Sequence, residues 1–189
     1  GSDELLNLIV RSFAGAGSGV AFATPTYPYY KKLIDLQDAR AVAIDFDDDY
    51  AMPDGLAAAD APLTFVPNPN SPSGTAVSSD DLAALASALS GVLVVDEAYV
   101  DFARQGSMDL VAAHPNLIVA RTMSKSFSLA GLRIGFCLAS PQIAAGLWKV
   151  KEHYNLNSLS QVAAEAALDD VDWMRRNARR VVATRARLT

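Results

Sequence analysis

The chain has 189 residues, 51% of them hydrophobic and 20% charged, a composition typical of a globular domain with a buried core. A net charge of −5 and a pI near 4.9 argue against nucleic acid as a partner. No apolar run approaches the roughly 20 residues that span a bilayer, so no membrane partner is expected either. No signal peptide is visible.

Cysteine and histidine usage narrows the chemistry further. Cys137 is the single cysteine, which excludes a disulfide framework and a cysteine metal cluster. His114 and His153 lie far apart and outside any ligand-spaced motif, so no metal site is predicted. The expected compartment is the reducing cytoplasm.

Hydrophobic periodicity predicts an alternation of helices and short strands. Apolar residues at helical spacing predict a helix at 3–14, and glycines then interrupt it. The predicted strands are the short apolar runs 20–23, 41–44, 63–66, 92–95, 117–120 and 134–138. The other predicted helices are 27–37, a helix capped by Ser78 or Ser79 that runs to about residue 89, and 141–151, 158–169 and 171–187.

This alternation indicates an α/β fold, a three-layer sandwich whose central sheet is mainly parallel and covered by helices on both faces. Ligands of such sheets bind beyond the carboxyl ends of the strands. The polar residues of chemical interest follow predicted strands, as this rule would require: Asn70, Asp96, Tyr99, Ser124 and Lys125.

Lys125 follows the fifth predicted strand. The commonest explanation of a loop lysine is a solvated side chain, but a lysine amine of lowered pKa can form a Schiff base with an aldehyde and move protons. Thr122 and Ser124 place hydroxyls beside it. Arg133, eight residues further on in a glycine-containing turn, could clamp a phosphate through two hydrogen bonds.

Asp96 follows the fourth predicted strand, and its apolar neighbours place it at the edge of the core. A buried carboxylate needs a cationic or hydrogen-bonding partner, and a protonated pyridine nitrogen would be one. Tyr99 is close enough in sequence to offer its hydroxyl to the same ring.

Four further residues each have two possible interpretations. Ser2 and Asp3 open the first helix, where free amides favour an anion, although a simple cap is the commoner role. Tyr27 could stack on a flat ring or be an ordinary core aromatic. Asn70 lies in a Pro/Asn-rich turn, where its amide could reach a ring substituent or serve the turn alone.

Taken together, these residues resemble the fold-type I aminotransferases that use pyridoxal 5'-phosphate (PLP). The motifs that carry the resemblance are residues 122–127 (TMSKSF), 130–135 (AGLRIG) and 96–99 (DEAY). A closer resemblance, to the histidinol-phosphate aminotransferase subgroup, rests on residues 1–4 (GSDE), 24–27 (TPTY) and 154–157 (YNLN).

The resemblance implies a role for each residue. Lys125 would hold PLP as a Schiff base, Asp96 would pair with the pyridine nitrogen, and Tyr27 would stack on the ring. Tyr99 and Asn70 would hydrogen-bond the ring oxygen. The implied phosphate ligands are Ser2, Asp3, Thr122, Ser124 and Arg133. One position departs from the family pattern, because Ser71 stands where many members have an asparagine before the turn proline.

The resemblance also implies a reaction and a domain plan. The reaction would move an amino group from a small-molecule donor to a keto acceptor, with histidinol phosphate and glutamate as the favoured pair, in a homodimer. Residues 1–151 would form the PLP-binding large domain. Residues 152–189 would form a helical connector toward a C-terminal small domain that is not part of this chain.

Three alternatives stay open on the sequence. One is another PLP enzyme on the same scaffold, such as an aromatic or other amino-acid aminotransferase or an amino-acid-phosphate decarboxylase. The second is a PLP-binding sensor domain within a regulator. The third is a fragment that folds but is inactive.

Overall fold

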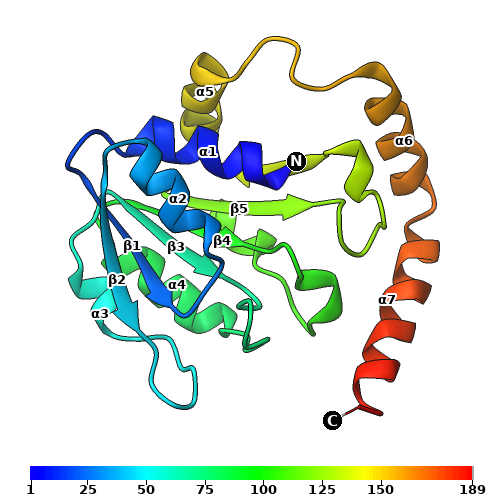
Figure 1. The fold of residues 1–189 in the computed structure, drawn as a ribbon, viewed down its shortest axis with the longest axis horizontal. Helices are drawn as coiled ribbons and strands as arrows, with labels where there is room; N and C mark the ends of the chain where they lie inside the picture. Colours follow the sequence, from blue (N-terminus) through cyan, green and yellow to red (C-terminus); the bar gives the residue numbers. More distant parts are fainter. Residues whose placement is uncertain (189) are drawn as a thin grey trace.

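A computed structural model describes residues 1–188, which fold around one six-stranded sheet (Figure 1). The strands are β1 (Gly19–Thr24), β2 (Arg40–Asp45), β3 (Leu63–Pro67), β4 (Val92–Asp96), β5 (Leu117–Thr122) and β6 (Gly135–Ala139). Their order across the sheet is β2-β1-β3-β4-β5-β6. β1 to β5 run parallel, and only the edge strand β6 runs antiparallel, beside β5.

Helices cover both faces of the sheet, as Figure 1 shows. One face carries α1 (Ser2–Phe13), α2 (Tyr29–Leu36) and α5 (Pro141–Val150), and the other carries α3 (Gly55–Ala58) and α4 (Ser79–Ala88). Short 3-10 turns η1 (Val100–Phe102), η2 (Met108–Ala112) and η3 (Ala130–Leu132) lie in the connections. The predicted three-layer α/β fold is therefore confirmed.

The strands alternate their side chains between two hydrophobic clusters, one on each face. On β3, Leu63 and Phe65 pack beneath α1 and α2, whereas Val66 packs beneath α4. Burying a side chain of this size contributes about 1.5–3 kcal/mol relative to leaving it exposed. This two-sided burial explains why the central strands are apolar throughout rather than alternating.

The helix ends follow local chemistry. Ser78 caps α4, because its side-chain oxygen accepts a hydrogen bond from the backbone N–H of Asp81 at 3.1 Å. α2 begins at Tyr29, two residues later than predicted, directly after Pro28. The four-residue helix α3 was not predicted.

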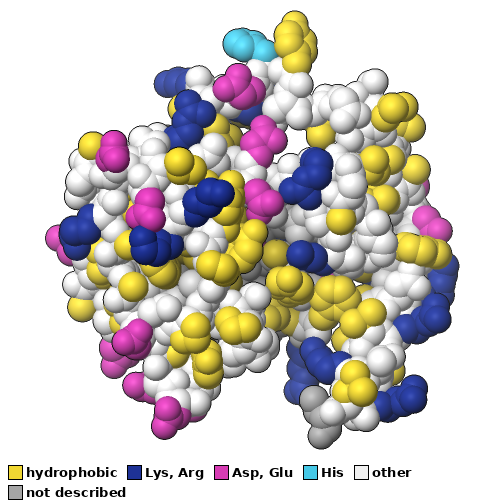
Figure 2. All heavy atoms as spheres, in the orientation of Figure 1, with side chains coloured by type: hydrophobic (Ala, Val, Ile, Leu, Met, Phe, Trp, Pro, Cys, Tyr) yellow, Lys and Arg dark blue, Asp and Glu magenta, His cyan; other side chains and the backbone are white. Residues whose placement is uncertain are grey.

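Two further helices, α6 (Ser158–Asp169) and α7 (Val171–Arg185), run along the side of the domain beyond the carboxyl end of β5 (Figure 1). α7 contacts η1 and buries Met174 and Ala178. Its other faces are solvated, and Figure 2 shows basic side chains along this side of the molecule. Among residues 1–188, no helix is long and apolar enough to cross a membrane.

Candidate active site

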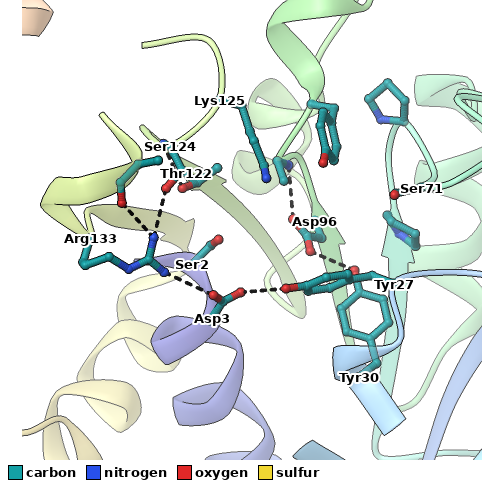
Figure 3. Close-up of a pocket in the computed structure, with 15 residues that line it drawn as sticks. Ser2, Asp3, Tyr27, Tyr30, Ser71, Asp96, Thr122, Ser124, Lys125 and Arg133 are labelled. Atoms are coloured by element: carbon teal, nitrogen blue, oxygen red, sulfur yellow. Dashed lines mark hydrogen bonds and ion pairs between the residues drawn. The ribbon is translucent and has the colours of Figure 1, made fainter. Parts of the chain in front are cut away.

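The carboxyl ends of the parallel strands surround one cavity of about 160 Å³ (Figure 3). Segments far apart in the sequence form its walls: the start of α1, the start of α2, the loops after β3, β4 and β5, and the turn before β6. The lining residues are Ser2, Asp3, Tyr27, Tyr30, Pro67, Pro69, Ser71, Asp96, Ala98, Tyr99, Thr122, Ser124, Lys125, Ala130 and Arg133.

Asp96 ends β4 and is only 5% exposed. The hydroxyl of Tyr30 donates to its Oδ2 at 2.8 Å, and the backbone N–H of Ala98 donates to its Oδ1 at 3.1 Å. No Lys, Arg or His among residues 1–188 forms an ion pair with it. Burial raises the pKa of Asp96, and the two hydrogen bonds oppose that rise. This carboxylate therefore lines the cavity without a cationic partner among the described residues.

Lys125 lies on the opposite wall, in the turn after β5. Its Nζ lies 5.2 Å from the centre of the Tyr99 ring, and no described residue forms a hydrogen bond or ion pair with it. The backbone around it is held firmly, because Ser128 N–H donates to Lys125 O at 3.0 Å and the buried Ser126 hydroxyl donates to Asp101. A free amine on a fixed turn can react with a ligand in the cavity.

Arg133 forms the third wall, at the end nearest α1. Its Nη1 donates to Ala130 O at 3.0 Å and approaches Ser124 Oγ at 3.5 Å, while its Nη2 donates to Asp3 Oδ2 at 3.1 Å. Thr122 Oγ1 accepts from the backbone N–H of Ser124 at 3.2 Å, and both residues line the cavity together with Arg133. Cation and hydroxyls together suit a phosphate group.

The amino end of α1 adds amide donors at the same place. No side chain caps this helix end, so its first N–H groups are available to an anion. The approach depends on Gly135, because a Cβ built there would lie 2.5 Å from Ser2 N and 2.8 Å from Gly1 C. A residue without a side chain is needed for β6 to pass this close to α1.

Tyr27 lies between the two ends of the cavity. Its hydroxyl donates to Asp3 Oδ1 at 3.1 Å, and its ring packs edge-on against Tyr30 with centroids 5.7 Å apart. Burial and the nearby Asp3 raise the pKa of Tyr27 to about 12. The phenol stays protonated at neutral pH and links Asp3 to the aromatic wall.

Nine of the ten predicted site residues line this cavity, and Asn70 is the exception. The Asn70 amide donates to Pro25 O at 3.2 Å and Ser73 Oγ at 2.9 Å, and its Oδ1 accepts from Thr26 at 2.9 Å. These bonds tie the turn after β3 to the end of β1. Ser71, the position of the family departure, faces the cavity in its place.

Tyr30 is the residue of the site that the sequence analysis missed. It is fully buried, stacks on Phe65 with ring centroids 4.7 Å apart, and lines the cavity. The available signal was its place three residues after Tyr27, a spacing that would put both rings on one face of the helix predicted at 27–37. Nothing in the sequence showed that this face meets Asp96.

A buried ion pair supports the loop after β4. Glu97 is enclosed, pairs with Arg121 Nη2 at 2.6 Å and accepts from Arg121 Nε at 2.7 Å and from the N–H of Ser107. The pair lies outside the cavity lining. It connects the residue after Asp96 to Arg121 on β5.

Known proteins share this architecture. The solved histidinol-phosphate aminotransferase from Sinorhizobium meliloti, in complex with pyridoxal-5'-phosphate, superposes with a TM-score of 0.94 at 34% identity, over 100% of this chain and 54% of that one. Fold and cavity together define an aminotransferase-type α/β domain. The chain belongs to the class I and II aminotransferase family, whose model matches residues 1–189.

Sequence relatives carry a more specific name. A histidinol-phosphate aminotransferase of a Geobacter species is 46% identical over 100% of this chain and 54% of its own length. Histidinol-phosphate aminotransferase 1 of Trichormus variabilis is 44% identical, with the same coverage. The chain thus spans about half the length of the curated relatives it matches.

Proposed function

We propose that this chain is the PLP-binding part of a histidinol-phosphate aminotransferase. The observation that carries the proposal is Asp96, a buried carboxylate without a cation, facing a cavity shared with Lys125 and Arg133. The 46% and 44% identity to proteins of that name supports the choice within the family.

The residues present fit the cofactor. A protonated pyridine nitrogen would supply the cation that Asp96 lacks. A phosphate would be held by Arg133, by the hydroxyls of Thr122 and Ser124, and by the amides at Ser2 and Asp3. Tyr27 offers an aromatic face between these two ends, and Tyr99 carries a hydroxyl on the Lys125 side.

Bound PLP would supply an aldehyde that bonds amines and a ring that stabilises negative charge at the substrate α-carbon. In the proposed mechanism Lys125 Nζ would hold the cofactor covalently until the substrate amine takes its place. The freed Nζ would be the group that takes a proton from the substrate α-carbon and gives it back, as general base and then general acid. Asp96 keeps the proton on the ring nitrogen, and Arg133 prevents the phosphate end from moving.

The proposal extends to the whole protein. Its donor and acceptor would be histidinol phosphate and 2-oxoglutarate, which yield imidazole acetol phosphate and glutamate in histidine biosynthesis. We further propose a cytoplasmic homodimer. Residues 1–151 would be its large domain, and residues 152–189 a connector to a C-terminal small domain.

Borohydride reduction of the PLP-loaded full-length protein tests the assignment. Peptide mass spectrometry should locate the reduced adduct on Lys125, and Lys125→Ala should lose both the adduct and the visible absorption band. Weaker noncovalent binding should persist through Asp96 and Arg133, while transamination falls by orders of magnitude. Lys32→Ala, an exposed lysine on α2, is the matched control and should behave as wild type.

An adduct on another lysine, or normal turnover in Lys125→Ala, would overturn the proposal. Product analysis separates the related reactions. Stoichiometric glutamate from histidinol phosphate and 2-oxoglutarate identifies the proposed enzyme, whereas release of CO₂ from an amino-acid phosphate would indicate a decarboxylase instead.

A further inference from the structure

The contact between Tyr30 and Asp96 has no place in the mechanism above. Tyr30 is 0% exposed, and its hydroxyl meets Asp96 Oδ2 at 2.8 Å from the side of α2 (Figure 3). Its ring is fixed from two directions, stacked on Phe65 and edge-on to Tyr27. A hydroxyl held this rigidly can donate to only one acceptor, and that acceptor is the carboxylate.

We propose that Tyr30 is a positioning residue that keeps Asp96 ionised and orients its carboxylate toward the ring nitrogen of the cofactor. This inference rests on the proposed function. The N–H of Ala98 holds Oδ1 and Tyr30 holds Oδ2, so the two donors fix the plane of the carboxylate between them. The same carboxylate lines the cavity.

The electrostatic surroundings explain why such a donor is needed. Burial raises the pKa of Asp96, and the nearby carboxylates of Asp3 on α1 and Glu97 on the same loop raise it further. Only the hydrogen bonds from Tyr30 and Ala98 lower it. Lys125 faces the same cavity from the β5 side without contacting the carboxylate.

Tyr30 itself stays a neutral donor, because burial and the adjacent carboxylate raise its own pKa well above the ordinary value. Removing its hydroxyl should therefore raise the pKa of Asp96 in the cofactor-free protein. Binding a protonated ring would then first require Asp96 to lose a proton. Each unit by which that pKa exceeds the working pH weakens binding about tenfold.

The test compares Tyr30→Phe with wild type in the full-length protein, and uses two ligands. One is PLP, and the other is its analogue in which a carbon replaces the ring nitrogen. Dissociation constants are measured from pH 5 to 8 (the chosen assay range) by fluorescence titration. Tyr29→Phe is the matched control, since it removes a hydroxyl from the same helix that has no hydrogen bond to any described residue.

Tyr30→Phe should weaken PLP binding about threefold to tenfold at pH 7 and by more as the pH falls. The reason is that a higher pKa of Asp96 raises the pH below which PLP affinity is lost. Affinity for the carbon analogue should stay within about twofold, since that ligand needs no ionised carboxylate. The Tyr29→Phe control should match wild type with both ligands.

Equal weakening for both ligands at every pH would overturn the inference, because it would show that Tyr30 only shapes the wall. Unchanged PLP affinity in Tyr30→Phe would overturn it as well. A wild-type protein that binds no PLP would contradict the proposed function itself. Thermal unfolding of each variant verifies that the fold is kept.

Discussion

At the scale of single residues, Asp96 lowers the stability of the cofactor-free protein although cofactor binding requires it. Because burial raises its folded-state pKa, its contribution to stability is fully present below the unfolded pKa near 3.8 and is lost as the pH rises through the folded value. Above that folded value, the empty site holds a buried carboxylate that no Lys, Arg or His of residues 1–188 pairs with. Asp96 therefore lowers the unfolding free energy of the cofactor-free protein, although PLP binding requires its carboxylate.

Asp96→Asn should consequently stabilise the cofactor-free protein while it weakens PLP binding. We expect its Tm to rise by a few degrees at pH 7–8, since about 1 kcal/mol corresponds to roughly 2–4 °C in a domain of this size. Below the unfolded pKa, where wild-type Asp96 is neutral, the gain should vanish. Calorimetry across pH checks this sign, and a lower Tm at pH 8 would contradict it.

The residues found from sequence were those whose chemistry is unusual for their position. Lys125, Asp96 and Arg133 are charged groups directly after apolar strands or in glycine turns, and the structure brings all three to one cavity. Tyr30 was missed because a buried tyrosine on a helix is ordinary until its partner is known. Asn70 was predicted to bind the ring oxygen. Its bonds to Pro25 and Thr26 could not be predicted, because they cross 45 and 44 residues of sequence.

At the scale of elements, the phosphate end of the cavity depends on how closely β6 passes the start of α1. Gly135→Ala should displace α1, because the added Cβ would lie 2.5 Å from backbone that cannot yield cheaply. We expect a loss of about 1–3 kcal/mol in unfolding free energy, as for other overpacked sites. PLP affinity should fall with it, since the α1 amides move.

Gly131→Ala is the control for that variant. Gly131 belongs to the same segment of chain, but a Cβ built there meets nothing within 4 Å. Chemical denaturation of both variants should leave Gly131→Ala near wild type. Similar losses in the two would mean that the glycines act through chain flexibility rather than through the close approach.

Every strand of the sheet was predicted from the sequence, because each is a short apolar run. The inner strands β1, β3, β4 and β5 are buried, whereas the edge strands β2 and β6 are only partly buried. The apolar runs do not show whether neighbouring strands run parallel or antiparallel. β6 is antiparallel because only the η3 turn connects it to β5, with no helix to carry the chain back across the sheet. The short helix α3 was missed because four residues are too few to show a period.

At the scale of the whole molecule, ligand binding is linked to folding, because the cavity is formed by segments from α1 to the turn before β6. At 100 times its dissociation constant, PLP should stabilise the wild type by about 2.7 kcal/mol. That corresponds to an increase in Tm of about 5–10 °C. Differential scanning calorimetry should show a smaller shift for Lys125→Ala at the same concentration, and an equal shift would contradict the covalent anchor.

The contact between Asp3 and Arg133 joins residues 130 positions apart, and it places the first helix against the last strand. On the ribosome, α1 is therefore made long before the surface that covers it. At about 5–20 residues per second, those 130 residues take roughly 6–26 seconds to make, and until then the apolar side of α1, with Leu6, Ile9 and Val10, is not fully covered. Until the turn before β6 has been made, the cavity that α1 helps to form is incomplete.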